Sequence, residues 1–266
     1  MNKKMILITV GVVVFLAAVG GGLYYAFGTK PATSEEEAKS KKRVSEPENI
    51  LPVAERPVIY LIPKADGHNI EIIINTVKKT ATDAEYTLEY QTGTLVQAQE
   101  NVISLASLPV TENVFLGTCS AGGKCTFHED VQGGSLRTRF AADQSYVLKS
   151  DWKYIDNKAK EDAFSSRDAK FQITSDDLAD QRYVIIFNTP GYPEDLKGTP
   201  VSDPYTLNGS SELSGSGELT IRANEEGELA IMGWDGETWH EFKGTVDGKM
   251  VTAKVDLMSL YIAVKK

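Results

Sequence analysis

Beyond position 57, apolar and polar side chains alternate along the chain, and this alternation restricts it to β-structure. Every second residue is apolar in 86–90 and 251–255, and two arginines take the alternate positions of 136–140. Successive side chains of a strand point to opposite faces, so these segments are expected to be strands with one buried face. The runs 72–74 and 183–187 are apolar throughout, which predicts central strands covered on both sides.

Turn signals separate these segments at intervals of roughly ten residues. Each ends in glycine, which readily adopts the positive φ that tight hairpin loops need. Sustained helical periodicity is lacking beyond residue 57, apart from a turn or two at 157–163 and 176–180. The sequence therefore predicts an all-β fold made of antiparallel β-sandwiches. The signals are Asp66-Gly67, Thr92-Gly93, Gly133-Gly134, Asn208-Gly209, Glu226-Gly227, Asp235-Gly236 and Asp247-Gly248.

Residues 188–199 divide the predicted strands into two groups. Prolines and glycines interrupt the alternation there. We place a first β-sandwich domain at residues 57–190 and a second, smaller one at 191–266. The second is short for a sandwich, so we expect it to lean on the first for stability.

The N-terminal segment carries the longest apolar run. Residues 5–27 contain no charge, and Lys3 and Lys4 precede them. As a helix they would be about 34 Å long, enough to cross a hydrocarbon core of about 30 Å. We predict a transmembrane signal-anchor at residues 1–28, with the membrane as its partner. A cleaved signal peptide is the alternative, because small residues at 17–22 could form a cleavage site.

Residues 29–56 are rich in Lys, Glu, Ser and Pro, and we predict a flexible charged linker. Counting Lys and Arg beside the apolar run would place the C-terminal side in the cytosol. We expect the opposite, because the basic cluster lies well beyond the run and two cysteines favour an oxidising exterior. The predicted location is the cell membrane, single-pass, with extracytoplasmic C-terminal domains.

The charge is distributed unevenly. The chain carries −9, but Lys3 and Lys4 contribute +2 and the linker is neutral, so residues 57–266 carry −11. An acidic region argues against nucleic acid and anionic lipid as partners. Basic proteins, neutral glycans and divalent cations remain compatible.

Cys119 and Cys125 are separated by five residues that include two glycines. Such a spacer lets the chain turn sharply, so we expect a disulfide. Two inert thiols, or a soft-metal site that includes His128, are the alternatives. A bridge over so short a loop would shape the loop and add little to the stability of the domain.

The sequence contains no recognisable catalytic constellation. It has three histidines, His68, His128 and His240, and it lacks a Gly-x-Ser-x-Gly elbow and the paired histidines of a zinc-protease helix. The acidic groups 176–180 and 129–130 lack the spacing of a calcium loop. We therefore predict no enzymatic activity, no cofactor and no metal site.

Four aromatic residues are candidates for ligand contact. Trp152 and Tyr154 share one face of a predicted strand, and Trp234 and Trp239 flank a turn. Exposed rings would stack on sugars, whereas large aromatics mostly fill cores or cover edges. We favour the core interpretation and keep these residues as candidates.

The last hairpins carry a resemblance. Gly233-Trp234-Asp235-Gly236 with Trp239, then the segments 244–255 and 260–264, resemble immunoglobulin-like sandwich modules of bacterial surface proteins. The resemblance covers about residues 230–264 and implies an immunoglobulin-like fold, without catalytic residues.

These observations favour a membrane-anchored, extracytoplasmic binding or structural protein of a bacterial cell envelope, such as an adhesin or an envelope-complex subunit. Its partner would be an unknown protein or glycan. A carbohydrate-binding surface module that uses exposed tryptophans is the alternative.

Overall fold

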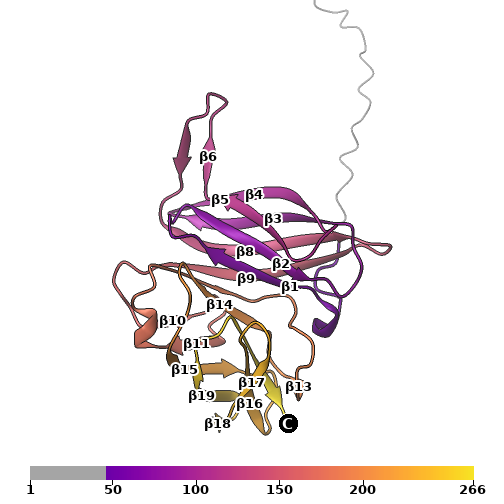
Figure 1. Ribbon diagram of the computed structural model, residues 1–266, viewed down its shortest axis with the longest axis vertical. Helices are drawn as coiled ribbons and strands as arrows, with labels where there is room; N and C mark the ends of the chain where they lie inside the picture. Colours follow the sequence, from indigo (N-terminus) through magenta and orange to yellow (C-terminus); the bar gives the residue numbers. More distant parts are fainter. Residues whose placement is uncertain (1–45) are drawn as a thin grey trace, which may run out of the picture. The chain divides into compact units, whose positions relative to one another are not determined.

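One long antiparallel sheet runs through the described part of the chain and is shared by two sandwiches (Figure 1). The computed structural model describes residues 46–266. These residues form twenty strands and two 3-10 turns, so the predicted all-β fold with sandwich-like sheets is confirmed. Within 46–266, no helix is both long and apolar enough to cross a bilayer. The predicted signal-anchor, 1–28, and residues 29–45 of the predicted linker lie outside the described residues.

The strand order of the long sheet is β17-β16-β20-β14-β12-β9-β8-β3-β4, and β13 pairs with β20. The bounds are β3 (Asp83–Thr92), β4 (Leu95–Ser104), β8 (Val131–Ala141), β9 (Tyr146–Asp156), β12 (Tyr183–Phe187), β13 (Thr199–Pro200), β14 (Tyr205–Gly209), β16 (Leu229–Trp234), β17 (Trp239–Phe242) and β20 (Leu260–Lys265).

Two smaller sheets pack on the long one. The first has the order β1-β2-β5 and the second β10-β11-β15-β19-β18, while β6 and β7 form a separate hairpin. The bounds are β1 (Val58–Pro63), β2 (Asn69–Thr76), β5 (Val110–Phe115), β6 (Gly117–Cys119), β7 (Cys125–Phe127), β10 (Ala163–Ser165), β11 (Phe171–Thr174), β15 (Ser216–Arg222), β18 (Thr245–Asp247) and β19 (Met250–Asp256), with 3-10 turns η1 (Val53–Glu55) and η2 (Asp176–Leu178).

Strand β12 belongs to both sandwiches. Ile185 and Phe187 pack in the core beneath β1-β2-β5, whereas Val184 and Ile186 pack in the core of the second sandwich. Because alternate residues of a strand face opposite sides, the two small sheets cover opposite faces of the long sheet. The apolar run 183–187 is therefore a central strand covered on both sides, as its sequence predicts.

A third apolar cluster lies on strands β16 and β20 of the long sheet. Met232 and Ile262 project into it, and it is covered by Val58 of β1 and by Tyr192 and Leu196 of the loop before β13. This loop contains the prolines and glycines at 188–199. Residues 188–199, which interrupt the strand pattern in the sequence, thus contribute buried side chains to the third apolar cluster.

The hydrophobic cores do not divide at residue 190. Strands β10 and β11 precede that position, yet β11 pairs with β15 and Phe171 lies in the second core. The second sandwich therefore recruits residues 163–174 from the segment assigned to the first domain. Residues 46–266 form one compact unit, because a continuous sheet joins the two cores.

Residues 46–56, the end of the predicted linker, lie against the first sandwich; we call them the N-terminal segment. Asn49 pairs with Lys149 through two hydrogen bonds (2.8 and 3.1 Å), and its backbone N–H donates to Val147 O (2.9 Å). Arg56 donates to two carbonyls of the same segment. Polar contacts thus hold this segment together with two apolar ones, since Leu51 packs against the first core and Val53 against the third apolar cluster.

Candidate functional site

Trp152 and Tyr154 are core residues. Trp152 is fully buried in β9, and its Nε1 donates to Glu89 O (3.2 Å). Tyr154 is 5 % exposed and meets the Trp152 ring edge-on at 6.5 Å between centroids. Neither ring has a face available to a ligand.

Trp234 and Trp239 are half-buried at the rim of the second sandwich. They face each other across the β16–β17 hairpin with ring centroids 5.3 Å apart. Both pack against the third apolar cluster, and Trp239 Nε1 donates to Glu194 O (2.8 Å). The loop before β13 therefore packs on these rings, and little of their surface remains free for stacking on a sugar.

The histidine beside this pair stabilises a turn. Asp235 accepts backbone hydrogen bonds from Thr238 (2.7 Å) and Glu237 (2.8 Å), and these bonds, with His240, hold the pKa of its carboxyl well below the usual range. Nε2 of His240 contacts both Asp235 Oδ2 (2.6 Å) and Thr238 Oγ1 (3.1 Å). A catalytic relay needs one ring nitrogen for each partner, so this trio lacks that geometry.

The other two histidines have structural contacts. His68 stacks on Phe127 with ring centroids 3.6 Å apart, and His128 Nδ1 lies 2.8 Å from Tyr90 Oη. Among the described residues, no three His, Cys, Asp or Glu side chains converge as metal ligands. Asp177, in one of the acidic groups, accepts the backbone N–H of Ser216 (3.0 Å).

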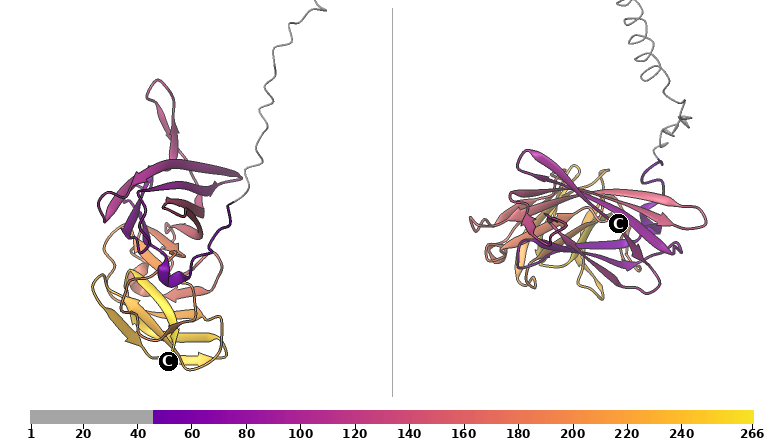
Figure 2. Two further views of the ribbon diagram at one scale, coloured as in Figure 1. Left: turned by 90° about the vertical axis from the view of Figure 1, so that its right-hand side faces the viewer. Right: turned by 90° about the horizontal axis from the view of Figure 1, so that it is seen from above.

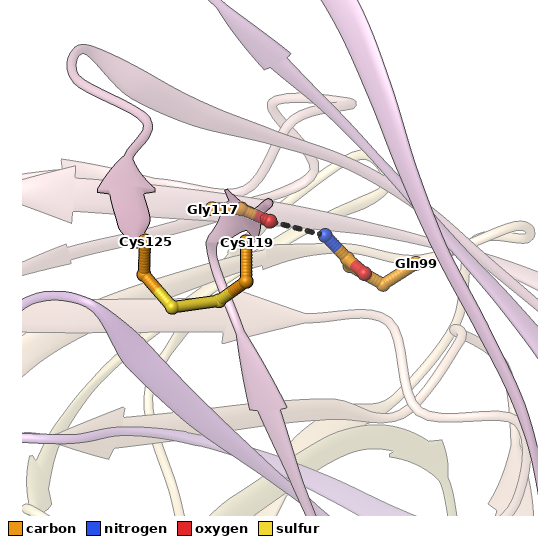
Figure 3. The surroundings of a disulfide bond; sticks show 4 residues. All are labelled: Gln99, Gly117, Cys119 and Cys125. Atoms are coloured by element: carbon orange, nitrogen blue, oxygen red, sulfur yellow. Dashed lines mark hydrogen bonds between the residues drawn. A yellow bond between two sulfur atoms is a disulfide. The ribbon is translucent and has the colours of Figure 1, made fainter. Parts of the chain in front are cut away.

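The predicted disulfide is confirmed. Cys119 and Cys125 are joined across the β6–β7 hairpin (Figure 3). The hairpin continues from β5 and extends beyond the sheets in Figures 1 and 2 (left view). Its residues are exposed apart from the base, where Gly117 O accepts a hydrogen bond from Gln99 Nε2 (2.9 Å). The hairpin is thus pinned at its tip by the disulfide and attached at its base to β4.

Strand β4, at the end of the long sheet, has one row of backbone groups with no partner strand among residues 46–266. Thr92 and Leu95 close a two-residue loop, so they form a hydrogen-bonded pair of the β3–β4 hairpin. Counting on from Leu95, the odd-numbered residues of β4 bond to β3. The even-numbered residues from Val96 to Val102 direct their N–H and C=O groups away from β3.

Strand β4 lacks most of the features that normally protect a sheet edge from pairing with another chain. The N–H of Val102 is satisfied locally by the Asn101 side chain (2.9 Å), in agreement with its outward direction. Otherwise β4 contains no proline or lysine, and its ten-residue pairing with β3 has no register shift. Long, regular edges of this kind are usually blunted by charge, bulges or proline.

Exposed apolar side chains gather around the same edge. Five of the seven large apolar residues exposed within 46–266 lie in β4, in the loop that follows it, or in the hairpin. This concentration makes β4 with the β6–β7 hairpin the best candidate for a binding surface; we call it the β4–hairpin surface. The five residues are Leu95, Val96, Val102, Leu108 and Phe127.

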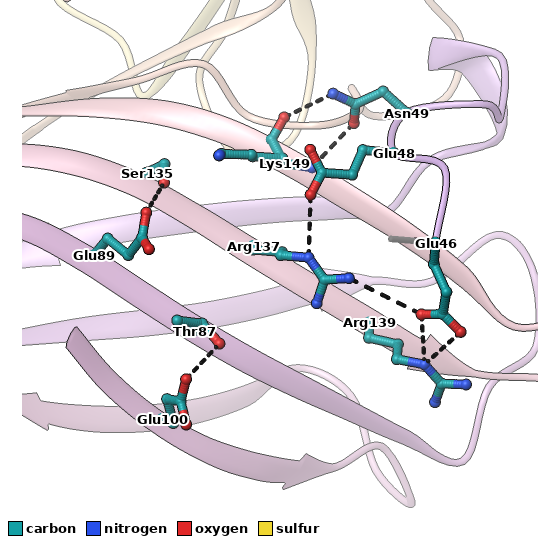
Figure 4. Close-up of polar contacts among 10 residues, drawn as sticks. All are labelled: Glu46, Glu48, Asn49, Thr87, Glu89, Glu100, Ser135, Arg137, Arg139 and Lys149. Carbon is teal, nitrogen blue, oxygen red and sulfur yellow. Dashed lines mark hydrogen bonds and ion pairs between the residues drawn. The ribbon is translucent and has the colours of Figure 1, made fainter. Parts of the chain in front are cut away.

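Polar side chains cover the outer face of the sheet beside β4 (Figure 4). Glu46 pairs with Arg139 (2.8 Å) and Glu48 with Arg137 (3.1 Å), so the N-terminal segment occupies both arginines. Nearer the edge, Glu100 accepts a hydrogen bond from Thr87 (3.1 Å). Both arginines of β8 are thus paired with the N-terminal segment, whereas Glu89 and Glu100 accept hydrogen bonds from hydroxyl groups and have no ion-pair partner among residues 46–266.

Sequence reasoning missed this surface. The run 95–104 alternates weakly, and its order in the sheet is set by long-range pairing. Its lack of lysine and proline was the one available signal.

No family model, curated protein or solved structure matches the chain.

Proposed function

We propose that this chain is a membrane-anchored, extracytoplasmic binding or structural protein of a bacterial cell envelope that holds a partner protein at the β4–hairpin surface and has no catalytic activity. The observation that carries the proposal is the concentration of exposed apolar side chains around one unprotected sheet edge. A long sheet edge with free backbone groups is a template for pairing with another chain, and exposed apolar side chains beside it add surface to bury.

Two further observations support the location. The disulfide of the hairpin is the kind of bond that persists in an oxidising compartment. The apolar run at 5–27 has the length of a bilayer span. The finer proposal, that the modules are immunoglobulin-like, rests on the sequence resemblance of residues 230–264. The half-buried tryptophans give little support to the carbohydrate-binding alternative.

Site-specific photo-crosslinking in cells tests the binding surface. A photoreactive amino acid at Val102 or Phe127 should give adducts with another protein. The same residue at Val246, an exposed apolar position of β18, serves as the matched control and should give none. Absence of adducts at Val102 and Phe127, or equal labelling at Val246, would refute the proposal.

Protease accessibility tests the location. Protease added to intact cells or spheroplasts should cleave within the basic cluster 39–43, which precedes the folded region. Complete protection would place the domains on the cytoplasmic side.

A further inference from the structure

We propose that β4 binds an extended segment of a partner protein as an additional antiparallel strand of the long sheet, and that this segment carries a basic residue between two apolar ones. The inference rests on the proposed function, because it names the partner chemistry of the same surface. It explains why an edge of ten residues is regular and has no second partner strand among residues 46–266.

The backbone supplies the first argument. The outward N–H and C=O groups of Val96, Ala98 and Glu100 have no partner among the described residues, and that of Val102 is held only by the adjacent Asn101 side chain. A strand that pairs here would form main-chain hydrogen bonds along seven residues of β4. Main-chain bonds give affinity in strand addition, and side chains at alternate positions give specificity.

The side chains specify the partner. On the outer face, Val96 and Val102 stand at the two ends of the free row, with Glu100 between them. Directly opposite in β3 lie Glu89, across from Ala98, and Glu85, across from Val102. A partner strand is therefore complementary when it places apolar residues opposite the two valines and Lys or Arg opposite Glu100.

The position of the hairpin argues against a second copy of this chain. Any two-fold antiparallel pairing that uses residues 96–102 has its axis within about one residue of Gln99. Gln99 is also where the hairpin attaches, through Gly117 O. Because the hairpin extends past the edge (Figure 1), self-pairing would bring two hairpins to the same axis. A single extended segment meets only one hairpin, on the inner face to which Gln99 points, and makes its side-chain contacts on the outer face.

The test compares Ala98→Pro with Ala98→Thr in the full 266-residue chain. Proline removes the outward N–H of residue 98, which β3 does not use, so the fold should survive. Threonine keeps the N–H and is a good strand former, so it is the matched control. Unfolding of Ala98→Pro would show that β3 uses this N–H and would overturn the proposal.

The probe is a labelled peptide, Thr-Val-Thr-Lys-Thr-Ala-Thr-Val-Thr, which places lysine opposite Glu100 in antiparallel register. Fluorescence anisotropy should show binding to the wild type and to Ala98→Thr. Binding should weaken roughly ten-fold or more for Ala98→Pro, the loss expected for an unmade backbone hydrogen bond. A peptide with glutamate in place of lysine should also bind more weakly, because it sets like charges opposite each other.

Three results would overturn strand addition: no binding at about 1 mM peptide, equal binding to the proline variant, or equal loss in the threonine variant. Dimerisation of the chain that Ala98→Pro abolishes would identify a second copy as the occupant, and would overturn the proposed partner. If Val102 still crosslinks to another protein in Ala98→Pro cells, the proposed function stands while strand addition fails. If wild-type cells give no crosslinks, both fail.

Discussion

The two sandwiches share one sheet, but they end in different ways. In the second, the outermost strands β10, β17 and β18 have three or four residues each. In the first, the long sheet ends in β4, with ten residues. Short edges offer little backbone for another chain to pair with, whereas a long edge is a template. The difference favours the first sandwich as the place of the proposed recognition.

The three tryptophans also differ between the two sandwiches. Trp152 fills the core of the first, while Trp234 and Trp239 cover a rim of the second. Neither arrangement displays a ring for stacking. Function is therefore better sought at the open edge than at the tryptophans.

The largest expected effect separates core from rim. Trp152→Ala should lower the free energy of unfolding by about 3–5 kcal/mol, because it empties a fully buried site. Trp239→Ala removes a half-buried ring and should cost about 1–2 kcal/mol. Urea denaturation measures both. Equal losses would contradict the division between core and rim.

The shared strand offers the next test. Ile185→Ala should create a cavity in the first core and Ile186→Ala one in the second, each costing about 2–5 kcal/mol. Since one sheet joins both cores, either change should shift a single unfolding transition. Two transitions, each moved by only one of the variants, would show that the sandwiches unfold separately.

The disulfide is expected to act locally. Chain entropy gives a bridge over so short a loop about 2 kcal/mol, exerted on a hairpin that stands apart from the cores. The Cys119→Ala and Cys125→Ala double variant should keep the global unfolding midpoint nearly unchanged, and its amides at 117–127 should exchange faster. A large drop in the midpoint would mean that the hairpin supports the first core.

Local chemistry made much of this fold predictable. Alternation identified strands such as β3 and β19, and the uninterrupted run 183–187 identified a strand covered on both sides. The spacing of Cys119 and Cys125 predicted their bridge. Each of these signals lies within a few residues of sequence, where backbone geometry and side-chain burial are directly coupled.

Strand order was not predictable, and the candidate site depends on it. Nothing near residue 171 indicates that β11 will pair with β15 rather than with its sequence neighbours. Likewise, β4 is exposed only because no later strand joins it. Long-range pairing depends on the packing of whole faces, which a single sequence does not display.

The smallest expected effect concerns the N-terminal segment, whose glutamates pair with arginines on the outer face of the first sandwich. The hydrogen bond from Arg139 lowers the pKa of Glu46. A carboxyl whose pKa is depressed by folding stabilises the folded arrangement above its unfolded pKa, and that contribution is lost as the pH falls through the folded value.

The N-terminal segment should therefore loosen on acidification while the cores stay folded. A lower protection factor for the Asn49 amide, which donates to Val147 O, would report it, because the protection factor removes the pH dependence of intrinsic exchange. Arg139→Gln should produce the same loosening at neutral pH, and Lys64→Gln, which breaks an ion pair with Glu71 away from this segment, should not. If the protection factor of Asn49 is unchanged by acid and by Arg139→Gln, then backbone pairing and the packing of Leu51 and Val53 hold the segment without the ion pairs. The arginines would then be available to a partner of the neighbouring β4 edge.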